Sequence, residues 1–189
     1  MSAQTAQMFT PAHFQADDVK LGELMLYVAQ RSKDDPFFGA TKLNKILYHA
    51  DFGAYRRWLR PITGHAYFRL KEGPAPQVLV KVRARLLEDE AASLKNVEVF
   101  GHKQKRLEAN RPANQSLFTN EELALVEDVI QSMQGMTAAQ VSAASHQLPG
   151  WRAAKDREVI PYETAFLSGV VTEPDRAWAF AMALQHGWL

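Results

Sequence analysis

Apolar residues recur at helical spacing in two long segments of the first third of the chain. Between positions 21 and 28 they fall three and four apart, which predicts a helix over residues 17–33 that the sequence KDDPFFG ends. A second pattern of this kind predicts a helix over residues 41–59, which stops before Pro61. We therefore expect two long helices to organise the first part of the fold.

Shorter segments of mixed character follow these helices. Imperfect alternation and a high content of β-forming residues predict a strand near 62–69. The sequence KEGPAP then turns the chain into a helix that reaches about Glu90, with Pro74 or Pro76 in its first turn. A β-hairpin is expected near 96–109, because apolar residues flank the sequence GHKQK.

Two helix starts carry a complete local signature. Thr119 and Glu122 have the spacing of a capping box, and so do Thr137 and Gln140. Gly135 lies where the helix that begins at the first box would need a left-handed cap. These signals predict two helices that follow one another with almost no linker.

A short helix over residues 151–157 and a last helix over residues 175–185 complete the expected elements. With about six to eight helices and a small antiparallel β element, the expected fold class is α+β and predominantly α-helical. We expect residues 1–15 to form a flexible leader and residues 16–189 a single domain, since no linker or change of composition divides them.

The helix expected over residues 41–59 carries two polar residues, Asn44 and Asp51, between two apolar stripes of a helical wheel. The stripes consist of Leu43, Ile46, Leu47, Ala50, Ala54 and Trp58, and of Tyr48, Phe52, Tyr55 and Leu59. Because a bare buried carboxylate is costly, we expect Asp51 to meet a cation, a tyrosine hydroxyl or backbone N–H groups. The sequence PITG after the helix offers hydroxyl and N–H donors, so the two polar residues would pin that turn to the helix. A partner-binding or catalytic role is the alternative.

Basic residues gather on the remaining side of the same helix and in the expected hairpin. The helix group consists of Lys42, Lys45, His49, Arg56 and Arg60, and the hairpin group of Lys103, Lys105 and Arg106. No acidic residue interrupts the helix group, so it is either a solvated face or a surface that docks on an acidic partner. Contact with phosphate is a third reading, although no exposed aromatic residues are interleaved with these cations.

Composition limits the classes of function. The chain has 189 residues, no cysteine and a formal net charge of +1. We therefore expect neither disulfides nor a thiolate site, nor a broadly basic nucleic-acid binder. No apolar run is long enough to cross a membrane, and the first residues lack the pattern of a secretory signal, so we expect a soluble cytoplasmic protein.

The sequence lacks the common motifs of catalysis and cofactor binding. The six histidines do not have metal-ligand spacing and no glycine-rich phosphate loop occurs, so neither a metal nor a cofactor is expected. Ser145 and His146 are neighbours on a helix and point about 100° apart, which prevents a nucleophile–base pair between them. We expect His146 to bond the last carbonyls of its helix, with Trp151 packed over that end. A small hydrolase that combines Asp51 and His146 stays an alternative.

Three sequence blocks in this order, TKLNKILYHADF, PITGHAYFRLKEGPAP and VSAASHQLPGW, followed by the short segment VIPYE, resemble the Panacea domain, also called the SocA-like antitoxin domain. The resemblance covers roughly residues 21–163. The matching positions are Lys42, Leu43, Lys45, Leu47, Tyr48, Asp51, Thr63, Gly64, Tyr67, Gly73, Pro74, Pro76, Ser142, Ser145, His146 and Trp151. The chain departs from the pattern at His49, where an aromatic residue is more usual, and at GPAP, where GPVP is more common.

The resemblance implies a mainly helical fold with a small β element and no catalytic residues. It also implies an antitoxin that binds and neutralises a protein toxin, usually encoded beside it, and in some members an adaptor that delivers the toxin to an AAA+ protease. We therefore expect a non-enzymatic antitoxin whose basic residues steer its partner.

A transcriptional regulator that binds nucleic acid through the hairpin, or through a helix-turn-helix joined at residues 133–141, is an alternative function. The residues after this junction supply few of the basic and amide side chains that read DNA bases, which makes a nucleic-acid partner the weaker expectation.

Overall fold

The computed structural model describes residues 14–167 of the 189-residue chain. The helix expected over residues 175–185 and most of the leader expected over residues 1–15 lie outside the described residues. The elements in chain order are α1 (Asp18–Arg31), α2 (Ala40–Trp58), β1 (Tyr67–Phe68), β2 (Ala75–Pro76), α3 (Leu79–Glu88), β3 (Ala92–Val99), β4 (His102–Ala109), η1 (Gln115–Leu117), α4 (Asn120–Met133), α5 (Ala138–Ser145), α6 (Pro149–Ala153), β5 (Val159–Ile160) and η2 (Tyr162–Phe166). The prediction of a predominantly helical α+β fold is confirmed.

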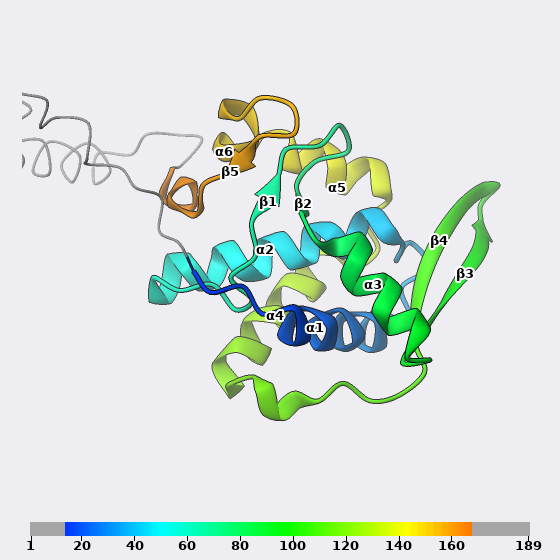
Figure 1. Cartoon of the computed structure of the whole chain (residues 1–189). Coiled ribbons are helices and arrows are strands. Elements are labelled where there is room, and N and C mark those ends of the chain that lie inside the picture. Colours follow the sequence, from blue (N-terminus) through cyan, green and yellow to red (C-terminus); the bar gives the residue numbers. More distant parts are fainter. Residues whose placement is uncertain (1–13, 168–189) are drawn as a thin grey trace, which may run out of the picture.

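Helix α2 runs through the middle of the molecule, and the other elements surround it (Figure 1). It contacts α1, α4, α5, β2 and η2. Leu47 and Ala50 on this helix are fully buried in a hydrophobic core that residues from all of these helices share. No helix within residues 14–167 is both long and apolar enough to cross a lipid bilayer.

Local chemistry sets the ends of the first two helices. Asp17 caps α1, where its carboxylate accepts a hydrogen bond of 2.8 Å from the backbone N–H of Lys20. Helix α2 ends at Trp58, and Leu59 takes a left-handed cap with a φ of 57° that leaves it 66% exposed. The expected place of Leu59 in an apolar stripe is therefore wrong, because helical geometry stops one residue earlier.

Three very short strands form an antiparallel sheet in the order β2-β1-β5. Tyr67 of β1 pairs with Pro76 of β2 on one side and with Ile160 of β5 on the other. The strand expected in this region is confirmed, but a helix that begins with Pro74 or Pro76 is wrong, since α3 begins only at Leu79. Pro76 instead lies in an edge strand, where its missing N–H costs no ladder bond.

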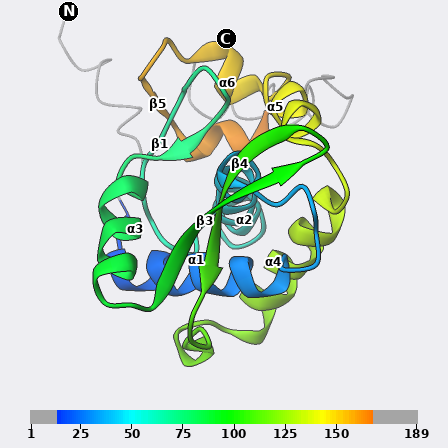
Figure 2. The ribbon, with the colours of Figure 1, turned by 90° about the vertical axis from the view of Figure 1, so that its right-hand side faces the viewer.

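The expected hairpin is confirmed and begins earlier than expected, at Ala92. Two residues, Phe100 and Gly101, join β3 to β4 with φ angles of 48° and 78°. Positive φ at both positions is the geometry of a type I′ turn. Leu107 at the base of the hairpin is buried opposite Leu94, whereas the tip extends past the helices (Figure 1) and the ribbon crosses in front of α2 (Figure 2).

Both predicted capping boxes are present. The pair Thr119 and Glu122 closes the start of α4, and the pair Thr137 and Gln140 closes the start of α5. Gly135 lies between the two helices with a φ of 74°, as the left-handed cap requires. The short helix expected next is α6, which ends before the predicted boundary.

Candidate functional site

The polar residue in the middle of α2 is fully buried and satisfied. Asp51 is 0% exposed, and its carboxylate accepts three hydrogen bonds. The backbone N–H of Thr63 donates at 2.7 Å, the hydroxyl of Thr63 at 2.5 Å and the hydroxyl of Tyr67 at 2.8 Å. The expected partners, an N–H and a hydroxyl of the turn after the helix together with a tyrosine, are confirmed.

Burial and hydrogen bonding act on the Asp51 carboxyl in opposite directions. Complete burial raises its pKa above the usual range, and the bonds from Thr63 and Tyr67 oppose that rise. Burial, with the Asp51 charge beside it, also raises the pKa of Tyr67 far above that of an exposed tyrosine, so its hydroxyl stays a donor. Asn44 does not join this group, because its side-chain oxygen is buried with no hydrogen-bond partner among the described residues. The expectation that Asn44 also pins the turn is wrong.

The turn that Asp51 holds also fixes the start of α1. The backbone N–H of Asp17 donates to the carbonyl of Thr63 at 3.0 Å. Gly64 follows with a φ of 73°, and a Cβ atom there would lie 2.6 Å from the carbonyl oxygen of Gln15. The glycine is thus needed both for the backbone conformation and for the close passage of the chain.

Two lysines that we placed on an exposed basic face are buried instead. Lys42 and Lys45 are each 1% exposed. Lys42 forms an ion pair of 2.6 Å with Asp35, which lies in the loop before α2. The interpretation of one continuous basic surface on this helix is therefore wrong, because the loop before α2 and the turn at Gly73 cover its first half.

Lys45 is buried and forms no ion pair within residues 14–167, although the charge of Glu72 acts on it from a distance. Its ammonium group lies 3.4 Å from the carbonyl oxygen of Pro74, and burial lowers its pKa to about 8. Burial and the charge of Lys45 lower the pKa of His49 to about 4, so this histidine is neutral at physiological pH. Only Arg56 and Arg60 of the helix group remain as exposed cations.

Replacing Lys45 by methionine is expected to stabilise the protein at pH 7, by about 1–3 kcal/mol, because a poorly compensated buried charge is removed. Below about pH 8 the lysine is charged in both the folded and the unfolded protein, so its burial destabilises the folded state fully. Between about pH 8 and pH 10.5 the folded protein releases this proton before the unfolded protein does, so the destabilisation disappears as the pH rises. Urea denaturation at pH 7 and pH 9.5 should therefore show a rise in stability for the wild type that Lys45→Met lacks. Destabilisation of the variant at pH 7 would mean that the Pro74 contact outweighs the buried charge.

Side chains of α5 and α6 hold three consecutive carbonyl groups of the turn before Gly73. The indole N–H of Trp151 donates to Leu70 at 3.1 Å, Nε2 of His146 lies 3.0 Å from the oxygen of Lys71, and the hydroxyl of Ser142 donates to Glu72 at 3.0 Å. The expectation that His146 bonds the carbonyls of its own helix is wrong, because its ring turns toward this neighbouring turn.

The expected packing of Trp151 over the end of α5 is confirmed. The rings of His146 and Trp151 stack with centroids 4.2 Å apart. Arg69, which lies on the segment after β1, places its guanidinium 4.2 Å from the centroid of the Trp151 ring. The second and third sequence blocks thus meet at one place, with Lys45 of the first block beneath them. The sequence alone singles out neither Arg69 nor Asp35. The partner of Arg69 is Trp151, which is distant in the sequence, and the partner of Asp35 is Lys42, which lies across a turn.

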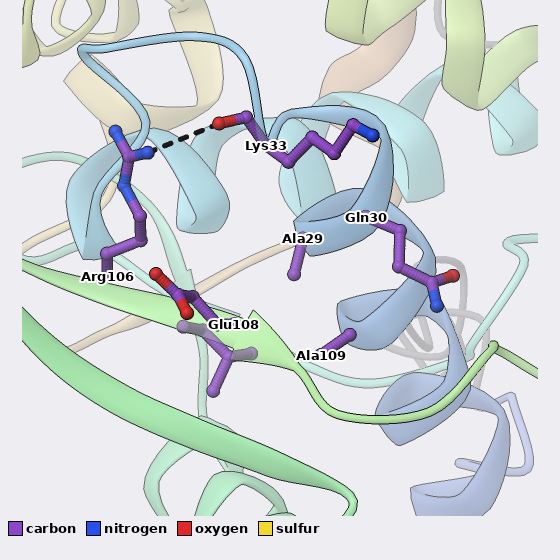
Figure 3. Close-up of a pocket in the computed structure, with 7 residues that line it drawn as sticks. Ala29, Gln30, Lys33, Arg106, Glu108 and Ala109 are labelled. Atoms are coloured by element: carbon purple, nitrogen blue, oxygen red, sulfur yellow. Dashed lines mark hydrogen bonds between the residues drawn. The ribbon is translucent and has the colours of Figure 1, made fainter.

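The hairpin group of basic residues also divides into buried and exposed members. Arg106 donates hydrogen bonds to four carbonyls of the loop after α1, and Figure 3 shows its guanidinium reaching the carbonyl of Lys33. The reading of Arg106 as a partner-binding cation is therefore wrong, since its donors are used inside the fold. Lys103 and Lys105 are exposed and form no ion pair within the described part of the chain.

The groups that a hydrolase would need are apart. Asp51 accepts hydrogen bonds from Thr63 and Tyr67, whereas His146 binds the carbonyl of Lys71, and no hydrogen bond joins Asp51 to His146 within residues 14–167. None of the described pockets is lined by both. The described residues also contain no group of three or more His, Cys, Asp or Glu able to hold a metal ion.

Comparison with known proteins agrees with the sequence blocks. The family described as "Antitoxin SocA-like, Panacea domain" matches residues 43–152. No curated protein and no solved structure matches the chain. The matched span runs from α2 through the hairpin to Trp151 and covers more than half of the 189 residues. The chain therefore belongs to the family of SocA-like antitoxins that carry a Panacea domain.

Proposed function

We propose that this protein is an antitoxin that binds a cognate protein toxin and neutralises it. One observation supports the proposal beyond family membership: four of the matching polar side chains bind other parts of the fold. Asp51 holds the turn at Thr63, and Trp151, His146 and Ser142 hold the 70–72 turn. A protein whose matching polar residues serve the fold in this way would act by recognising a partner at its surface.

Two separate groups of exposed cations would attract a partner. Arg56 and Arg60 lie at and just after the C-terminal end of α2, whereas Lys103 and Lys105 lie on β4, which packs at the other end of α2 (Figure 1). Charges of this kind speed association with an acidic partner more than they tighten the complex. An acidic toxin surface is therefore the partner chemistry that the proposal favours.

Co-expression with the protein encoded by the adjacent reading frame tests the proposal. We expect that protein alone to arrest growth, and growth to return when this chain is produced with it. A complex of the two should purify through a tag on either one. Growth arrest that persists with both proteins present, without a complex, would contradict the antitoxin function.

The same cells distinguish direct inhibition from delivery to an AAA+ protease. An inhibitor leaves the toxin level unchanged, whereas an adaptor shortens the lifetime of the toxin after synthesis is blocked. We propose direct inhibition in the cytoplasm as the primary mode, because burial of a toxin surface needs only the recognition described above. A shorter toxin lifetime would assign the adaptor role instead.

Nucleic-acid binding is the weaker alternative. In α5, the helix that would enter the groove, the amide oxygen of Gln140 accepts the N–H of Thr137 in the capping box. That side chain is therefore engaged where a recognition helix would need it to read a base. Gel-shift binding that weakens steeply with salt would favour this alternative over toxin binding.

A further inference from the structure

The tip of the β3–β4 hairpin carries the most exposed large apolar side chain of the described residues. Phe100 is 80% exposed, compared with 66% for Leu59 and Val80. It also has a φ of 48°, in the left-handed region that disfavours bulky side chains. Asparagine or glycine is strongly preferred in this turn type, so stability alone does not account for a phenylalanine here.

The exposed ring stacks on a second aromatic ring. Phe100 stacks on Phe37 with ring centroids 5.7 Å apart and an angle of 29° between the planes. The backbone N–H of Phe37 donates to the carboxylate of Asp35 at 3.0 Å, and Lys42 anchors that carboxylate from α2. Arg106 binds the carbonyls of the same loop from β4. These bonds order the loop that carries Phe37, so the ring on which Phe100 stacks is preorganised, which lowers the entropy cost of binding.

Positive charge borders one side of this aromatic tip. Lys103 and Lys105 follow the turn on β4 and are exposed, and neither forms an ion pair within residues 14–167. Glu98 lies opposite Lys103 in the register and is the acidic residue nearest the tip on β3. The tip therefore combines a protruding ring with two cations on its β4 side.

We propose that Phe100 is the anchor by which this protein binds its toxin, inserting into an apolar pocket that acidic residues of the toxin border. The inference rests on the proposed antitoxin function and names the surface that performs it. A protruding aromatic residue that fills a partner's pocket is a common source of binding energy, and the two lysines would meet the acidic border. The exposed position and the unfavourable backbone conformation of Phe100 are then the consequences of selection for binding.

The test uses Phe100→Asn in the full chain, with the purified product of the adjacent reading frame as the probe. Asparagine suits the left-handed position, so the variant should melt at or above the wild-type temperature. Calorimetric titration should show an affinity at least tenfold weaker than that of the wild type. The double substitution Lys103→Glu and Lys105→Glu should slow association, most strongly at low salt.

Leu59→Asn is the matched control, because Leu59 is also an exposed apolar residue with a positive φ. We expect its affinity to equal that of the wild type. Absence of binding by the wild type would defeat the proposed function itself. If the wild type binds and Phe100→Asn binds equally well, or only Leu59→Asn weakens the complex, the hairpin is not the anchor. A loss of self-association by Phe100→Asn with unchanged toxin binding would also overturn the inference, by assigning the ring to a second copy of this chain.

Discussion

Replacing Asp51 by alanine is expected to destabilise the protein by about 3–5 kcal/mol. The substitution leaves the N–H and hydroxyl of Thr63 and the hydroxyl of Tyr67 buried without their acceptor, and it opens a cavity beside α2. Burial disfavours the charged form of the carboxyl and raises its pKa. Removing the carboxyl is nevertheless destabilising, because leaving a buried donor without an acceptor costs more free energy than a single hydrogen bond contributes. Urea denaturation at pH 7 measures the loss directly.

Asp128→Ala provides the control for this prediction. The Asp128 side chain is 67% exposed on α4 and lies 3.8 Å from Arg57, so its removal should change stability by less than about 0.5 kcal/mol. An Asp51→Ala protein as stable as the control would show that Asp51 does not hold the turn. A folded Asp51→Ala variant that fails to bind the toxin would instead assign this residue to recognition.

Gly73→Ala is expected to cost about 3 kcal/mol or more. Gly73 has a φ of 99°, which an alanine adopts only with strain of about 1–2 kcal/mol. Its new methyl group would clash with the hydroxyl of Ser145 and lie 2.6 Å from Cε of Lys45. Both contacts belong to packed elements, so relief requires a shift of the turn against α2 or α5, at an overpacking cost of about 1–3 kcal/mol.

Gly135→Ala separates the two costs. Gly135 also has a positive φ, of 74°, but a Cβ atom there meets nothing within 4 Å. We expect this control to lose only the backbone contribution of about 1 kcal/mol, as measured by the same urea titration. Equal losses for the two variants would mean that the turn at Gly73 has room to move and that the three sequence blocks are not tightly packed there.

Features that depend on neighbouring residues could be predicted from the sequence. The capping boxes at Thr119 and Thr137 are complete within four positions, and both are present. The partners of Asp51 could be predicted because the donors at Thr63 follow the same helix directly. In each case the necessary groups are brought together by local geometry alone.

Features that depend on distant segments could not be predicted. A helical wheel places Lys42 and Lys45 among the basic residues, and only the fold reveals that Asp35 and the turn at Pro74 cover them. In the same way the sequence predicts Arg106 as a surface cation, because its four carbonyl partners lie about 70 residues away along the chain. Charge counted along one element cannot show which charges another element neutralises.

The hydrogen bonds of the family blocks join residues at very different separations along the chain. We expect this difference to affect the order in which they form during folding. The bonds from Thr63 and Tyr67 to Asp51 close loops of 12 and 16 residues, whereas those from Ser142, His146 and Trp151 to the 70–72 turn close loops of 70 to 81 residues. Longer loops lose more entropy on closure, so the Asp51 contacts are favoured to form first. We therefore expect helix α2 and its following turn to form early in folding, and α5 and α6 to dock onto them late.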